Sequence, residues 1–208
     1  MALKRPARLA ALGLLAWGLT ACGTAPPDPP TAPVAAPAAA VETGPPAVFA
    51  LRSAAFGPGQ EIPARYTCEG LDLSPPLDWD APPAGTKSLA LLVRDPDAPD
   101  PAAPSLTWTH WLLLNLPPAA GGLPEQAGNA GHSGTPVGAL DGLNDWGRPG
   151  WGGPCPPVGR HRYQFVLYAL DTLPARRPDW TCAQLETLAA TRALATARLE
   201  ATYRKRQP

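Results

Sequence analysis

The chain has 208 residues, including 30 prolines and 20 glycines, and its 17 basic residues balance its 17 acidic residues. Three of the basic residues lie in an N-terminal segment that we expect to be removed, which leaves 14 basic against 17 acidic residues in the mature chain. The sequence contains no basic run interleaved with aromatic residues. Composition and charge therefore argue against nucleic acid as a partner.

Residues 1–21 have the pattern of a secretory signal. Basic residues precede an apolar run from Leu9 to Leu19, which is too short to span a bilayer as a permanent helix. The run ends in LTAC, which resembles a bacterial lipobox, in which Cys22 is lipidated on its thiol and becomes the mature N-terminus. The alternative is an ordinary cleavable signal with an incidental cysteine. We therefore predict a protein of the bacterial cell envelope that is lipid-anchored through Cys22, at the outer membrane or the periplasmic face if the source is Gram-negative.

A proline- and alanine-rich stretch, 22–47, follows the signal. It consists almost entirely of alanine, proline, threonine and glycine, so it cannot bury a core and is predicted to be an extended, semi-stiff tether. The remainder, 48–208, is long enough for one domain with its own hydrophobic core.

Short strands separated by turns are the expected elements of this domain. Prolines interrupt the chain often, and helical periodicity is absent until near the C-terminus. The pattern predicts a mainly β fold, an antiparallel, Greek-key-like β-sandwich. The strands are predicted at 48–56, 60–66, 88–95, 107–116 and 161–171.

One helix is predicted near the C-terminus, over roughly 182–204. Thr181 and Gln184 have the spacing of a capping box. Apolar residues then recur at helical spacing, namely Leu185, Leu188, Ala195 and Leu199. We expect this helix to pack on the sheets in a structural role.

Three cysteines remain after the lipobox: Cys68, Cys155 and Cys182. Export permits a disulfide, and we favour a pair between Cys68 and Cys155 because both flank proline- and glycine-rich turns; other pairings stay open. No close spacing of cysteine and histidine indicates zinc. We expect no metal and no cofactor.

Polar residues fall on otherwise apolar strand faces. Along 161–171, alternation groups His161 and Tyr163 with Phe165, Leu167 and Ala169. Along 88–95, Asp95 ends a row that contains Leu89, Leu91 and Val93. Along 107–116, alternation groups Trp108 and His110 with Leu112 and Leu114.

These rows predict a small pocket with an apolar floor. If the strands meet at one end of the sheet, Asp95, His110, His161 and Tyr163 surround it, and Asp95 orients an imidazole. Protonated imidazoles, together with backbone amides from the glycine-rich segment 150–157, would bind a phosphate or a carboxylate. His132, in the stretch GNAGHSG, is expected to be a surface residue.

Six segments resemble the phosphatidylethanolamine-binding protein family, in particular its bacterial Raf-kinase-inhibitor-like branch. They are IPARYTCEG, SPPLDW, SLALLVRDPDAP, THWLLLNLP, LNDWGRPGWGGPCPP and GRHRYQFVLYALD, in the same order as in the family. DPDAP followed by HW, GPCPP and HRY is a highly specific series that spans nearly the whole domain.

The resemblance implies an antiparallel sandwich with one small anion pocket. It assigns ligand contacts to Asp95, His110, His161 and Tyr163, and wall positions to Pro99, Trp108 and Gly153. The sequence departs from the family at Trp151, where a tyrosine is usual, and it lacks the serine and arginine that follow DPDAP in eukaryotic members. The eukaryotic kinase-inhibitor function is therefore not carried over.

Three functions compete. We favour a non-catalytic module that binds a small anion or a phospholipid headgroup at a membrane surface. The alternative is a protease inhibitor that acts through a protein-facing surface, with a protease as its partner. Hydrolysis is least favoured, because Ser105 and Ser133 lack a nucleophile-elbow motif and Cys155 would need an imidazole within reach.

Overall fold

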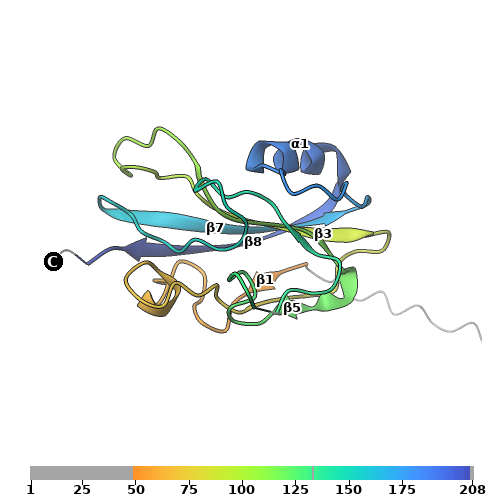
Figure 1. The fold of residues 1–208 in the computed structure, drawn as a ribbon, viewed down its shortest axis with the longest axis horizontal. Coiled ribbons are helices and arrows are strands. Elements are labelled where there is room, and N and C mark those ends of the chain that lie inside the picture. The colour runs from red at the N-terminus through yellow and green to blue at the C-terminus, as the bar shows by residue number, and fades with distance from the viewer. Residues whose placement is uncertain (1–48, 133, 207–208) are drawn as a thin grey trace, which may run out of the picture. The chain divides into compact units, whose positions relative to one another are not determined.

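The structure is a computed structural model that describes residues 49–132 and 134–206 (Figure 1). The predicted signal 1–21, the predicted lipidation site Cys22 and the predicted tether 22–47 lie outside the described residues, as does Ser133. All elements below belong to one compact unit, Gly44–Pro208, and both apolar cores lie within it. Because this unit contains its own cores, we expect it to fold alone, and the experiments below use it.

A five-stranded antiparallel sheet in the order β6-β4-β3-β7-β8 is the larger of two sheets. The predicted strands at 88–95, 107–116 and 161–171 are confirmed as three of these strands. The strands are β3 (Ser88–Asp95), β4 (Trp108–Leu116), β6 (Leu140–Asp141), β7 (Arg160–Leu170) and β8 (Ala193–Arg204).

A three-stranded antiparallel sheet contains β1 (Leu51–Arg52), β2 (Leu77–Trp79) and β5 (Gly122–Leu123). The predicted strand 48–56 is thus reduced to two residues. The predicted strand 60–66 is wrong: Glu61 makes a single bridge to Thr202, and Ala64–Tyr66 form the short 3-10 helix η1. The carbonyl of Pro63 accepts a hydrogen bond from the Tyr66 amide at 2.9 Å, which turns the chain instead of extending it. A second 3-10 turn, η2 (Pro118–Ala120), precedes β5.

The five-stranded sheet packs on other elements at both faces, although β8 and the start of β7 leave part of the second face exposed (Figure 1). Its first face packs on the three-stranded sheet through residues such as Val93, Phe165 and Leu199. Its second face packs on helix α1 (Cys182–Arg192) through residues such as Leu92, Val166 and Leu185. The predicted antiparallel sandwich with a C-terminal helix is confirmed, and the alternation predicted for β3 and β7 is the one observed.

The C-terminal helix is shorter than predicted. The capping box of Thr181 and Gln184 is present, but α1 ends at Arg192, and 193–204 form β8 rather than helix. From Ala197 onward every second residue is buried, a period that fits a strand and not a helix. β8 pairs with the whole length of β7, whose edge would otherwise present unpaired backbone groups. Among the described residues, no helix has the length and apolar character needed to cross a membrane.

Candidate functional site

A pocket of about 370 Å³ lies where β3 ends and β4 and β7 begin. Six of the seven predicted ligand-binding residues line it: Asp95, Pro99, Trp108, His110, His161 and Tyr163. Gly153 does not. Six further residues complete the lining: Ala98, Leu106, Trp146, Cys155, Pro156 and Pro157.

Asp95 and His161 form a buried pair beneath the pocket. Asp95 is 4% exposed and His161 is 0% exposed, and Asp95 Oδ2 lies 2.7 Å from His161 Nδ1. The other ring nitrogen, Nε2, lies 2.9 Å from the Val158 carbonyl, which can only accept, so Nε2 carries a proton. Both ring nitrogens of His161 are therefore engaged within the protein. The predicted contact of Asp95 with an imidazole is present, and His161 has no ring nitrogen left for a ligand.

A β-bulge places His110 in the pocket. β3 and β4 pair at Val93 with Trp111 and then at Arg94 with Thr109, so His110 has no partner on β3. Such an extra residue changes which side chains share a face. Leu112 belongs to the core beneath α1, whereas His110 packs on Tyr163 of the other face, with ring centroids 5.2 Å apart. The predicted row of Trp108, His110, Leu112 and Leu114 is thus wrong at the bulge.

His110 is neutral at physiological pH. Burial lowers the pKa of its imidazole to about 4, against the smaller opposing effect of a hydrogen bond to the Gly152 carbonyl. That bond, 2.6 Å long, fixes the proton on Nδ1, because a carbonyl can only accept. Nε2 then carries a lone pair. The predicted positive charge of this imidazole is corrected to a neutral acceptor.

Two pocket residues carry donors without partners. The Tyr163 hydroxyl and the Trp108 indole N–H are buried and make no hydrogen bond to the described residues. Burial raises the pKa of Tyr163, and the nearby Asp95 carboxylate, which does not reach hydrogen-bonding geometry with the hydroxyl, raises it further, so the hydroxyl keeps its proton. A buried donor without a partner is unfavourable by about 1–3 kcal/mol, which a ligand acceptor would relieve.

Aromatic and apolar residues form the mouth. Leu106 and Trp146 are 45% and 44% exposed, and the Trp146 ring meets Trp108 and His110 edge-on at 5.3 and 5.2 Å. The sequence prediction missed Trp146 as a pocket residue, because it lies in a loop that strand alternation does not describe. Trp146 could have been found from its segment, LNDWGRPGWGG, which is one of the six that resemble the family.

The backbone amides of the glycine-rich segment are used within the protein. Gly152 donates its N–H to the His110 carbonyl at 3.0 Å, and Gly153 donates to Asp72 Oδ1 at 2.7 Å. The predicted contribution of these amides to anion binding is therefore corrected. A Cβ at Gly153 would lie 2.3 Å from Asp72 Oδ1 and 2.7 Å from the Tyr66 carbonyl, so the glycine is needed for close backbone approach.

The predicted disulfide is confirmed, since Cys68 and Cys155 are bonded and Cys182 is free.

Trp151, where the sequence departs from the family, does not line the pocket. Its side chain is 2% exposed and stacks on Phe165, with ring centroids 6.3 Å apart. His132 is exposed and lies apart from the pocket. Within the described ranges, no group of three or more His, Cys, Asp and Glu side chains could hold a metal ion.

Comparison with known proteins agrees with the fold and the motifs. The sequence profile of the phosphatidylethanolamine-binding protein family matches residues 52–204. A UPF0098 protein of Methanothermobacter thermautotrophicus is 51% identical over 123 residues, which are 59% of this chain and 77% of that protein. A UPF0098 protein of Chlamydia trachomatis is 39% identical over 155 residues, which are 74% of this chain and 98% of that protein.

A solved structure agrees as well. YbcL of Escherichia coli, described as a member of the mammalian PEBP family, is 34% identical and superimposes with a TM-score of 0.69 over 76% of this chain and 99% of YbcL. Profile, relatives and fold therefore lead to one assignment. The chain belongs to the phosphatidylethanolamine-binding protein family, with bacterial and archaeal UPF0098 and YbcL-like proteins as its relatives.

Proposed function

We propose that the chain is an exported, lipid-anchored, non-catalytic protein that binds a small phosphate-bearing molecule in the pocket around Tyr163. The observation that carries the proposal is the pair of buried donors without partners, Tyr163 Oη and Trp108 Nε1, in a pocket whose residues are otherwise mostly apolar. Export and anchoring through Cys22 rest on the sequence pattern alone.

The pocket chemistry favours a ligand that is an oxyanion and also carries a proton. Tyr163 and Trp108 can donate to phosphate oxygens, while the neutral His110 can accept at Nε2. No lysine or arginine is among the residues that line the pocket, so a monoanion suits it better than a dianion. Aromatic rings at the mouth can hold a cation: the Arg148 guanidinium already lies 5.8 Å from the Trp146 ring centroid, and the ammonium group of phosphoethanolamine would be a second candidate for such a contact.

Replacing Tyr163 with phenylalanine tests the proposal, because it removes one hydroxyl and keeps the ring. We expect phosphoethanolamine to bind Tyr163→Phe about tenfold more weakly by calorimetry, the loss of one hydrogen bond to a charged group. Tyr168→Phe is the matched control, since Tyr168 is on the same strand but faces α1. In NMR spectra, the His110 ring signals should shift on titration while those of His132 stay unchanged.

Equal affinity of the Tyr163→Phe and Tyr168→Phe variants would contradict the proposal, as would a lack of saturable binding to the unmodified protein. Protease inhibition through an outer surface would then be the function to test, and it should survive loss of His161.

The affinity should also depend on pH in one direction. Because His110 can only accept, the bound phosphate must bring the proton between them, and its second pKa is about 6. Above that pH the protonated ligand becomes scarce, so the affinity should fall about tenfold for each further pH unit. In His110→Gln an amide can donate instead, so the fall should disappear. A flat profile for the unmodified protein would refute this account of His110.

A further inference from the structure

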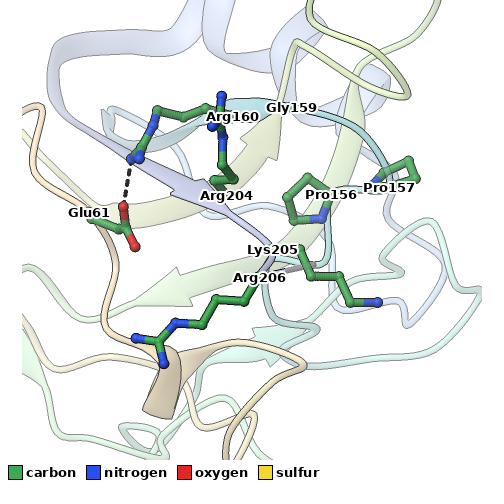
Figure 2. A pocket seen from close by; sticks show the side chains of 8 residues that line it. All are labelled: Glu61, Pro156, Pro157, Gly159, Arg160, Arg204, Lys205 and Arg206. Carbon is green, nitrogen blue, oxygen red and sulfur yellow. Dashed lines mark hydrogen bonds and ion pairs between the residues drawn. The ribbon is translucent and has the colours of Figure 1, made fainter. Parts of the chain in front are cut away.

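A second pocket, of about 660 Å³, opens beside the first and has a different character (Figure 2). Pro156 and Pro157 line both pockets and so form a shared wall. The second pocket, here called the basic pocket, is also lined by Glu61, Gly159, Arg160, Arg204, Lys205 and Arg206. None of the residues assigned to phosphate binding above is among them.

Positive charge is concentrated in the basic pocket. It contains four cationic side chains and one carboxylate, although the mature chain as a whole has more acidic than basic residues. Glu61 pairs with Arg160 at 2.7 Å. Among the described residues, Arg204, Lys205 and Arg206 make no direct ion pair. Hydrogen bonds lower the pKa of the nearby Glu69 carboxyl group, and the charges of Lys205 and Arg206 help to lower it further, so Glu69 offsets them in part, and the pocket keeps an excess of positive charge.

Strand pairing adds a specific repulsion. Arg160 of β7 and Arg204 of β8 are directly opposite in the antiparallel register. Like charges at opposed positions destabilise a sheet, by up to about 1 kcal/mol. Figure 2 shows that Arg160 turns toward Glu61, while Lys205 and Arg206 leave the end of β8 in different directions. An anion bound near the Arg160 and Arg204 side chains would offset their mutual repulsion.

The backbone that carries these charges is held in position. Glu69 accepts hydrogen bonds from the Tyr203 hydroxyl and, at 3.0 Å, from the Arg206 amide. Its neighbour Cys68 is bonded to Cys155, next to the shared proline wall. The end of β8 is thus fixed to the loop beside the first pocket, so the cations are presented on a rigid rim.

We propose that the basic pocket is a second ligand site, for a small polyanion that carries at least two phosphate or carboxylate groups. Because Lys205 and Arg206 point in different directions, a polyanion with several groups can contact more of these cations than a single oxyanion can (Figure 2). The volume is that of a small-molecule site. This site does not depend on the function proposed for the Tyr163 pocket.

Calorimetry with inorganic phosphate, pyrophosphate and tripolyphosphate tests the proposal. We expect tripolyphosphate to bind at least about tenfold more tightly than phosphate at low salt, with the difference shrinking as salt rises. Arg204→Gln should weaken tripolyphosphate binding about fivefold to tenfold. The same variant should be no less stable to heat, because it removes the repulsion with Arg160.

Arg198→Gln is the matched control, because Arg198 is exposed, lies on β8 and is about 20 Å from Arg204 along the strand. Equal weakening by Arg198→Gln and Arg204→Gln would overturn the proposal, since binding would then follow overall charge. Weakening by Tyr163→Phe but not by Arg204→Gln would place the polyanion in the first pocket, which also overturns it. So would Arg204-dependent binding to phosphatidylglycerol vesicles without tripolyphosphate binding, because the basic residues would then contact a membrane.

Discussion

Replacing both Cys68 and Cys155 with serine is expected to lower the free energy of unfolding by about 4 kcal/mol. The bridge joins residues 87 positions apart, and cross-linking a loop of that length removes a large amount of entropy from the unfolded chain. Neither cysteine belongs to an apolar core, so the loss of stability would come from the missing cross-link. Chemical denaturation of the double variant and the oxidised protein measures the difference.

The bridge also carries a functional consequence. Cys155 lines the Tyr163 pocket, and the two residues after it, Pro156 and Pro157, separate that pocket from the basic pocket. We therefore expect the double variant to lose affinity for phosphoethanolamine even under conditions in which it remains folded. Cys182→Ser is the control: this thiol is free, burial raises its pKa to about 11, and its loss should leave the bridge intact. A double variant as stable as this control would contradict the expectation.

Strand alternation predicted the parts of the site that regular strands build. β3 and β7 pair without interruption from Ser88 to Arg94, so side-chain parity is preserved along both. Asp95, His161 and Tyr163 consequently lie on the face that two-residue periodicity assigns to them. The motif series added Pro99, a loop position that strand periodicity does not describe.

Features that depend on contacts distant in sequence could not be predicted in the same way. The bulge arises because β4 has one residue, His110, between the partners of Val93 and Arg94, which are adjacent on β3. The sequence of either strand alone does not show this extra residue. The stretch from Ala193 is alanine-rich, which favours helix, and it becomes a strand because β7 offers a full-length edge. The basic pocket joins Arg160 to residues 204–206 through that same pairing, so it was not visible before the register was known.

Asp95→Ala is expected to destabilise the protein by about 3 kcal/mol. Asp95 accepts the Asp97 amide at 2.8 Å through Oδ1 and meets His161 Nδ1 through Oδ2. Alanine removes both contacts and leaves a fully buried imidazole nitrogen without a partner.

Asparagine can replace both contacts, provided that His161 is neutral. Its carbonyl accepts the Asp97 amide, and its NH₂ group donates to an unprotonated His161 Nδ1, while Nε2 still donates to the Val158 carbonyl. If His161 were instead an imidazolium, asparagine would leave two donors facing each other beside a buried charge, and Asp95→Asn would be as unstable as Asp95→Ala. Urea denaturation of the three proteins at neutral pH therefore decides which form the pair takes.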